Sequence, residues 1–325
     1  MSSDDLAPVR LPARDIPPPA TISDKARAAL SEGALGPDPG WPPAHDLDAW
    51  RAAVAGSAAM WEEAAAPVLA ASPSKVQTRT IGGVTCHVAT PPRASGEPVY
   101  MFIHGGAFVF GAGAYAKAQG AIQADHLGFV TVSVDYRTPP DHPFPAAAED
   151  CFAVYKALIE THDPSRIVIG GSSAGGNLAA AAMLMIGDRG LKAPAGLVLL
   201  TPEVDLTEAG DSFRTNVLLD TSLKGPLPDP NAVYAAGHDL TDPYLSPLYG
   251  ELSGFPPTLV QTGTRDILLS NSVLMHRKLR KAGVEAELHV WEAMPHGGFG
   301  PFGAGDAPEN AEIDDEVRRF IGRHT

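Results

Sequence analysis

Short β-branched runs alternate with alanine- and leucine-rich stretches along most of the chain. Two strands are predicted at 76–81 and 84–89, joined as a hairpin by Gly82 and Gly83. Further apolar runs predict buried strands at 97–103, 128–134, 167–169, 196–201, 258–262 and 285–291. Helices are predicted at 151–160, 177–186, 270–282 and 309–323. This alternation predicts an α/β fold with a mostly parallel, eight-stranded sheet flanked by helices.

Two regions depart from this alternation. Residues 1–45 are rich in Pro, Ala and Asp and predict one short helix near 22–32; a longer helix is predicted at 47–66, capped by Asp46 and ended by Pro67. Residues 206–246 lie between two strands but carry many polar, Gly and Pro residues, as lids and binding elements do. We therefore predict an N-terminal cap segment, 1–75, and a main domain, 76–325, whose insertion at about 206–246 completes a helical cap.

Composition narrows the classes of function. The 325 residues carry a formal net charge of -14 without a clustered basic patch, which argues against nucleic-acid binding. No apolar run is long enough to cross a membrane, and the first residues lack the pattern of a signal peptide. Cys86 and Cys151 match neither a metal site nor a disulfide framework. We expect a cytoplasmic protein without membrane insertion, cofactor or metal.

The turn after the strand at 167–169 carries the first chemical motif. Gly171-Ser172-Ser173-Ala174-Gly175 matches Gly-x-Ser-x-Gly and precedes the helix at 177–186. Such a motif predicts a sharp strand-to-helix turn that exposes the serine hydroxyl above the amino terminus of the helix. Side chains in place of the flanking glycines would collide with the adjacent strand and helix. Ser173 is therefore the candidate nucleophile.

A glycine-rich loop supplies candidate donors for an oxyanion. His104-Gly105-Gly106-Ala107 directly follows the strand at 97–103. Glycines in such a loop let backbone N–H groups face a substrate oxygen, and the residue after the nucleophile adds one more donor. We assign Gly105, Gly106 and Ala174 to the oxyanion hole and expect His104 to brace the loop.

Two further residues complete a triad. Asp266 follows the strand at 258–262, and His296 follows the strand at 285–291. Because the carboxyl ends of parallel strands meet at one edge of a sheet, both should lie near Ser173. The chain order Ser, Asp, His is that of the α/β-hydrolases. We assign His296 as the general base and Asp266 as the residue that orients it.

Together the motifs resemble the hormone-sensitive-lipase family of bacterial esterases, within the α/β-hydrolase fold. The matching segments are His-Gly-Gly-Ala-Phe at 104–108, Asp-Tyr-Arg-x-x-Pro-x-His-Pro-Phe-Pro-Ala at 135–146, Gly-x-Ser-Ala-Gly-Gly at 171–176 and Pro-His-Gly at 295–297. The resemblance covers residues 80 to 300 and implies a cap, short-to-medium acyl esters as substrates and, often, a homodimer through the last strand. The alternating pattern at 285–291 suits an exposed edge strand that pairs with a copy of itself.

Two positions depart from the family pattern. Ser172 stands where the family usually has Asp, which removes a carboxylate beside the nucleophile. Glu203 stands where the family usually has an aromatic residue, and we hypothesise that it contacts a polar group of the substrate. Phe108, Phe110, Tyr136 and Trp50 are candidates for the wall of the substrate pocket and equally for the core.

The sequence therefore predicts a serine carboxylesterase that acts on small-molecule esters through an acyl-enzyme. A lactonase would use the same residues and stays an alternative, whereas nothing in the sequence indicates an amidase or peptidase. Lipase action on insoluble fat is less favoured because the sequence has no strongly apolar lid. A non-catalytic ligand receptor on the same fold would be expected to lack a member of the triad, yet Ser173, Asp266 and His296 are all present.

Overall fold

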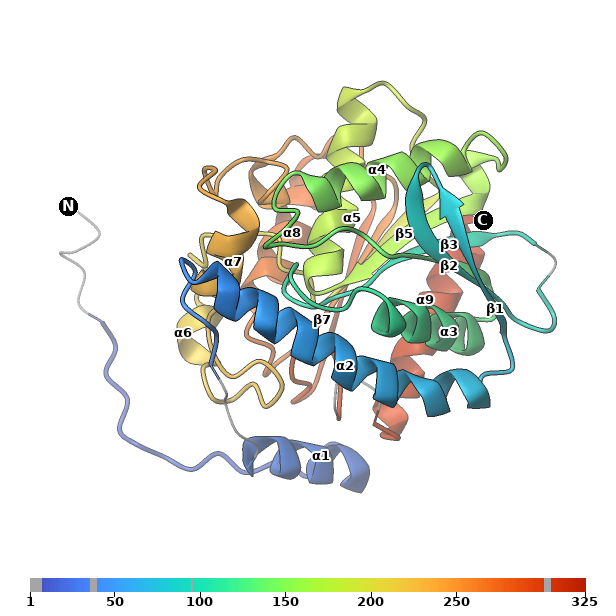
Figure 1. Ribbon diagram of the computed structural model, residues 1–325. Coiled ribbons are helices and arrows are strands. Elements are labelled where there is room, and N and C mark those ends of the chain that lie inside the picture. The colour runs from blue at the N-terminus through green and yellow to red at the C-terminus, as the bar shows by residue number, and fades with distance from the viewer. Residues whose placement is uncertain (1–7, 36–39, 95, 301–304) are drawn as a thin grey trace.

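One sheet of eight strands runs through the molecule, which a computed structural model describes at residues 8–35, 40–94, 96–300 and 305–325 (Figure 1). The strand order is β1-β2-β4-β3-β5-β6-β7-β8. β2 pairs antiparallel with β1 and β4, and every other pairing is parallel. The strands are β1 Lys75–Ile81, β2 Val84–Thr90, β3 Val99–Ile103, β4 Val130–Val134, β5 Ile167–Ser172, β6 Gly196–Leu200, β7 Thr258–Gly263 and β8 Ala286–Trp291. The predicted α/β fold is confirmed.

Helices cover both faces of the sheet. α4, α5 and α8 pack on one face with strand residues such as Met101 and Ile103, whereas α3 and α9 pack on the other with Tyr100 and Phe102. Successive side chains of a strand point to opposite faces, so one buried strand contributes to both layers. These helices are α3 Ala114–Leu127, α4 Ala146–Leu158, α5 Ala174–Asp188, α8 Leu269–Lys281 and α9 Pro308–His324, and 3-10 turns occupy Pro164–Arg166 and Pro247–Tyr249.

Three features differ from the sequence prediction. α3 was not predicted, because its buried side is mostly alanine and its apolar periodicity is weak. α4 begins at Ala146 rather than Cys151, directly after Pro145. The helix predicted to end at Pro67 continues to Ala71 as α2, Leu47–Ala71. The helical hydrogen bonding is kept in the turn after the proline, where Ser72 N–H donates to Val68 O at 3.0 Å.

The N-terminal segment and the insertion meet over the same side of the molecule. α2 crosses the front in Figure 1, and α7, Pro228–Ala235, lies beside its amino-terminal end. Ala44 N–H donates to Asp229 Oδ1 at 2.9 Å, and Trp50 packs with Val233 of the insertion. The insertion also carries α6, Ser212–Thr215. These contacts bring the two predicted cap segments together, and the division into a cap and a main domain stays a prediction.

The N-terminal segment also contacts the C-terminal part of the chain. In α1, Asp24–Leu35, the side chains of Ala26 and Leu30 pack with Met294 and Phe299 beside the loop that follows β8. Ser23 Oγ donates to Glu309 Oε2 of α9 at 2.8 Å. Residues 1–7 and 36–39 of the predicted cap segment lie outside the described residues.

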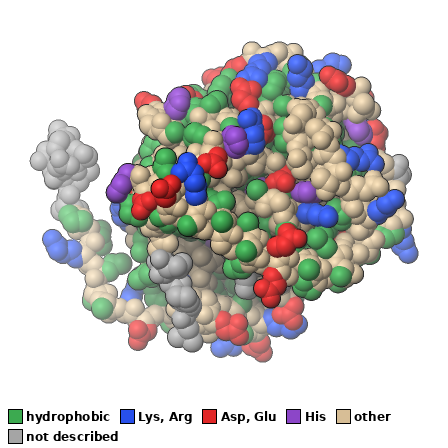
Figure 2. All heavy atoms as spheres, viewed as in Figure 1, with side chains coloured by type: hydrophobic (Ala, Val, Ile, Leu, Met, Phe, Trp, Pro, Cys, Tyr) green, Lys and Arg blue, Asp and Glu red, His purple; other side chains and the backbone are tan. Residues whose placement is uncertain are grey.

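The distribution of surface charge and the length and apolarity of the helices can be compared with the predicted absence of nucleic-acid binding and of membrane insertion. Acidic and basic side chains are interspersed over the face in Figure 2, without a concentrated basic patch there. Among the helices that the structure describes, none has the length and apolar character needed to cross a membrane. Cys86 and Cys151 are both buried as free thiols.

Candidate active site

Ser173 occupies a strained turn between β5 and α5. Its backbone angles are φ 58° and ψ -124°, a left-handed conformation that is costly for a residue with a side chain. Ser173 N–H donates to Leu200 O of β6 at 2.9 Å, which fixes the turn to the sheet. A Cβ atom on Gly175 would lie 2.0 Å from the carbonyl oxygen of Ile103, so the turn requires glycine there. The turn has the geometry predicted from the motif, with Ser173 half-buried at the sheet edge.

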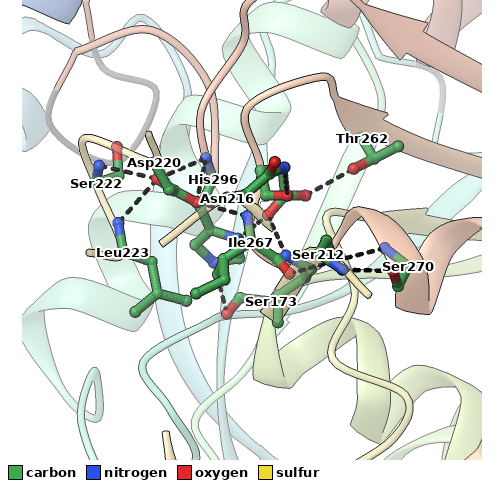
Figure 3. Close-up of polar contacts among 12 residues, drawn as sticks. Ser173, Ser212, Asn216, Asp220, Ser222, Leu223, Thr262, Ile267, Ser270 and His296 are labelled. Carbon is green, nitrogen blue, oxygen red and sulfur yellow. Dashed lines mark hydrogen bonds and ion pairs between the residues drawn. The ribbon is translucent and has the colours of Figure 1, made fainter. Parts of the chain in front are cut away.

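Ser173, His296 and Asp266 form one hydrogen-bonded row. Figure 3 labels Ser173 and His296 of this row. The distance from Ser173 Oγ to His296 Nε2 is 2.9 Å, and that from His296 Nδ1 to Asp266 Oδ1 is 3.1 Å. The side chain of Asp266 is fully buried and that of His296 is 13% exposed. Each residue follows the carboxyl end of its strand, β5, β7 or β8. The three residues singled out in the sequence therefore meet in space.

Hydrogen bonds fix the carboxylate of Asp266, and this carboxylate favours the protonated, charged form of His296. Thr262 Oγ1 donates to Asp266 Oδ2 at 2.7 Å, and Leu268 N–H donates to Asp266 Oδ1 at 2.9 Å. Burial lowers the pKa of His296, but the hydrogen bond to Asp266 and the charges of Asp266 and Asp220 outweigh it and raise the pKa above its ordinary value. The site thus stabilises an imidazolium on His296.

The predicted oxyanion loop lies against the nucleophile. A Cβ atom on Gly105 would be only 3.1 Å from Ser173 Cβ, so the two backbones approach closely. The N–H of Phe110 donates to Gly106 O at 2.8 Å and closes the loop into a turn. Ala174 is the first residue of α5, where backbone N–H groups have no partner within the helix. Gly105 and Ala174 therefore adjoin Ser173, and Gly106 follows Gly105 in the same loop.

His104 and Tyr136 form the buried support of this loop. His104 Nδ1 lies 2.7 Å from Gly105 O, and the ring stacks on that of Tyr136 with centroids 4.3 Å apart. Tyr136 Oη donates to His104 O at 3.0 Å. Burial lowers the pKa of His104 to about 4, so the ring is neutral near pH 7 and Nδ1–H is the donor to Gly105 O. This arrangement agrees with the bracing role predicted for His104.

The other aromatic candidates join the loop to the cap segments. Phe108 is fully buried and stacks on Tyr234 of α7, with ring centroids 4.2 Å apart. Trp50 and Phe110 lie 6.0 Å apart and share a cluster with Trp41, whose ring is 5.9 Å from that of Phe110. Sequence reasoning did not single out Trp41 or Tyr234. Their contacts depend on the position of the insertion and the N-terminal segment, which no local pattern gives.

Glu203 lies directly beside the nucleophile turn, fully buried. Its N–H donates to Ser173 O at 3.3 Å, and its Oε1 accepts from Asn231 Nδ2 of α7 at 2.8 Å. Oε2 is buried and has no hydrogen-bond partner among the described residues. Burial raises the pKa of Glu203 to about 8, so the carboxyl group is largely protonated at neutral pH. Asn231 was missed by the sequence analysis, although a polar residue in a buried apolar pattern is a signal for such a role.

A cavity of about 300 Å³ opens beside the row, on the face of the sheet covered by α3 and α9. Its lining includes Ser172, Thr201, Gln261 and Gly297, two of which adjoin Ser173 and His296 in sequence. The predicted pocket residues Phe108, Phe110, Tyr136, Glu203 and Trp50 are not among its lining residues. Ser172, which stands in place of the Asp expected from the family pattern, thus faces this cavity.

Two groups of acidic and histidine side chains have spacing that a metal ion could use. Asp220, Asp266 and His296 offer ligand atoms within 4.8 Å of one another, but these atoms are engaged in hydrogen bonds with each other, with Ser173 and with backbone N–H groups. The second group, Glu285, Glu287 and His324, lies at the surface, where Glu287 pairs with Arg323 at 2.6 Å. Neither group gives a reason to assign a metal to the described part of the chain.

A serine, a histidine and an aspartate that are hydrogen-bonded in a row at the carboxyl edge of a mostly parallel sheet, with a glycine-rich loop beside them, form the arrangement typical of a hydrolase of the α/β type. A family model described as the α/β-hydrolase fold matches residues 100–299. The chain belongs to this family.

Similar proteins narrow the class. An acetyl-hydrolase of Streptomyces hygroscopicus is 33% identical over 222 residues, which cover 67% of this chain and 73% of that protein. The solved structure of esterase E25 has a TM-score of 0.87 and 34% identity, covering 98% of this chain and 99% of its own. A hormone-sensitive lipase from a metagenome library has a TM-score of 0.79 and 31% identity, covering 94% and 99%. The predicted resemblance to the hormone-sensitive-lipase family of bacterial esterases is confirmed.

Proposed function

We propose that the protein is a serine carboxylesterase that hydrolyses short-to-medium acyl esters of small molecules. The observation that carries the proposal is the continuous row of hydrogen bonds from Ser173 through His296 to Asp266, with the loop at Gly105 beside it. The similarity to an acetyl-hydrolase and to esterases supports the same class of reaction.

Acylation follows from the geometry of the row. His296 Nε2 takes the proton of Ser173 Oγ while that oxygen attacks the carbonyl carbon of the ester. Asp266 holds the Nδ1–H of His296 and stabilises the imidazolium. The N–H groups of Gly105, Gly106 and Ala174 bind the oxyanion of the tetrahedral intermediate. When that intermediate collapses, the alcohol leaves with the proton from His296 and the acyl group stays on Ser173.

Deacylation repeats the sequence with water as the nucleophile. His296 takes a proton from water, whose oxygen attacks the acyl-enzyme carbonyl. Collapse of the second tetrahedral intermediate releases the carboxylic acid and returns the proton to Ser173. One ester and one water molecule are consumed, and one alcohol and one carboxylic acid are released, so the two halves of the reaction balance.

Substrate selection is assigned to the cap. In this proposal, residues 1–75 and 206–246 form the cap, and Phe108, Phe110, Tyr136 and Trp50 belong to the pocket wall or support it. The buried Oε2 of Glu203 would accept or donate a hydrogen bond to a polar group of the substrate. A cytoplasmic location and a homodimer through β8 are further predictions of the sequence.

Hydrolysis of p-nitrophenyl esters from acetate to palmitate tests the function. We expect turnover to be greatest with short acyl chains and to fall by roughly three to six orders of magnitude in Ser173→Ala. Circular dichroism should show that the variant is folded. If the folded wild-type protein turned over no linear ester, lactones would be tested next. Absence of turnover on both classes would favour the non-catalytic receptor.

A further inference from the structure

The insertion contributes a row of polar side chains to the loop that carries Asp266 (Figure 3). Ser212, Asn216 and Asp220 recur every four residues. Ser212 Oγ donates to Ile267 O at 2.6 Å and accepts from Ser270 N–H at 2.9 Å. Asn216 Nδ2 donates to Asp266 O at 2.8 Å. The loop is therefore held by side chains on the neighbouring insertion as well as by its own hydrogen bonds.

Asp220 extends this contact to the loop that carries His296. Its Oδ2 accepts from Ile267 N–H at 2.9 Å, and both of its oxygens lie 3.2 Å from His296 N, which donates to them. The N–H groups of Ser222 and Leu223 donate to Oδ1, each at 3.0 Å. The side chain is fully buried. The carboxylate of Asp220 thus connects the backbone of Ile267, the residue after Asp266, with the backbone of His296.

The charge of Asp220 also acts within the row. One carboxylate oxygen of Asp220, one of Asp266 and one ring nitrogen of His296 all lie within 4.8 Å of one another. Burial, and then the charge of Asp266, raise the pKa of Asp220 to about 6. The titratable groups that face Asp220 are Asp266 and His296, and those that face His296 are Asp266, Asp220 and Glu203, of which Glu203 is largely protonated at neutral pH. Two buried carboxyl groups therefore adjoin one imidazole.

We propose that Asp220 is a positioning residue for the proposed ester hydrolysis, which holds the loops of Asp266 and His296 in register and adds its charge to the stabilisation of the imidazolium. The inference rests on the function proposed above for the row. It gives the insertion a role in the reaction itself, beyond covering the substrate. Within the part of the chain that the structure describes, the side chain of Asp220 makes its hydrogen bonds to Ser222, Leu223, Ile267 and His296, and none to Ser173 or to the loop at 104–107.

The first test compares Asp220→Asn with Asp211→Asn, an exposed carboxylate at the start of α6 in the same segment. We expect Asp220→Asn to lower kcat roughly 10- to 100-fold with little change in KM, because the base is misplaced while the pocket is retained. Loss of the charge should move the acid limb of kcat/KM to lower pH by roughly one unit. Asp211→Asn should match the wild type. An acid limb that stays in place in Asp220→Asn would overturn the proposal.

A second variant separates charge from placement. Asp220→Glu keeps the carboxylate but changes its reach, so kcat should fall while the acid limb stays near that of the wild type. If Asp220→Glu and Asp220→Asn shifted the limb equally, the charge of Asp220 would have no part in it, and the inference would fail.

The third measurement does not depend on turnover. The ring pKa of His296 is followed by NMR in histidine-labelled protein and assigned with His296→Asn. We expect a wild-type value above 6.5 and a lower value in Asp220→Asn. A wild-type value below 6.5 would contradict the proposal even if Asp220→Asn failed to fold. If the wild type hydrolysed no ester but this titration behaved as expected, the proposed function would be wrong and the contact between Asp220 and His296 would stand.

Discussion

Glu203 is an acid held out of water beside the nucleophile. Its Oε1 is bonded to Asn231, and its Oε2 is buried without a partner among the described residues. An ionised carboxyl group in this place would lose hydration that a single amide does not replace. The protonated form, with one donor and remaining acceptor capacity, is therefore favoured and is suited to bind a polar substrate group.

Glu203 should make stability depend on pH. The unfolded chain releases this proton near pH 4.5, whereas the folded protein keeps it until about pH 8. Between these values the folded state binds more protons, so the contribution of Glu203 to the free energy of unfolding falls as pH rises and levels off above pH 8. Glu203→Gln removes this term. Its stability relative to the wild type should increase from pH 5 to pH 9, by an amount on the order of a few kcal/mol.

Urea unfolding at pH 5 and pH 9 measures this difference. Glu62→Gln, at an exposed site on α2, is the matched control and should show no such change. The same Glu203→Gln variant tests the substrate hypothesis, because it should change the rank order of esters with and without a polar group. A stability difference independent of pH would show that Glu203 is ionised in the folded protein, and an unchanged rank order would remove its role in selection.

At the scale of elements, α5 holds both ends of the insertion. Asn177, in the first turn of α5, donates from Nδ2 to Glu203 O and to Leu245 O, each at 2.7 Å. These carbonyl groups belong to the segments where the chain leaves β6 and where it returns from the insertion. The helix that begins at the nucleophile therefore also fixes the insertion that carries Asp220.

Asn177→Ala should destabilise the protein and lower kcat. The substitution leaves two buried carbonyl groups without this donor, which should cost about 2 to 4 kcal/mol in the free energy of unfolding. Chemical denaturation measures the change in the free energy of unfolding, and ester hydrolysis measures the change in kcat. A loss of less than about 0.5 kcal/mol, the range of ordinary surface substitutions, would show that other groups replace these bonds.

At the scale of the whole molecule, β8 is an edge strand of the sheet. β8 pairs with β7 on one side and has no neighbour on the other in the described chain. Val290 on this strand is 45% exposed. An exposed edge with an apolar side chain is a surface through which two copies of a chain can pair.

The homodimer predicted from the sequence is tested by light scattering after size-exclusion chromatography. We expect the wild type to be a dimer and Val290→Lys to shift toward monomer, because like charges oppose each other across a two-fold strand pair. Val273→Lys, at an exposed apolar site of α8, should stay dimeric. A monomeric wild type at micromolar concentration would refute the prediction, and a dimer untouched by Val290→Lys would move the interface elsewhere.

Local pattern determined much of this protein. Apolar or alternating stretches of three to seven residues sufficed for the eight strands, and the motifs at their carboxyl ends sufficed for Ser173, Asp266 and His296. Parallel strands bring such ends to one edge whatever lies between them, so residues distant in sequence were grouped correctly. The turn at Ser173 was likewise predictable, because its glycines are demanded by backbone contacts within a short segment.

Tertiary structure alone decided the rest. α3 presents mostly alanine to the sheet, and α2 continues through Pro67, so their extents depend on packing and on bonds in the next turn rather than on apolar periodicity. Asp220, Asn231 and Asn177 gave no motif, because each acts on backbone or side chains 26 or more residues away. A polar side chain acquires such a role only when folding excludes water from it and leaves a particular partner within reach.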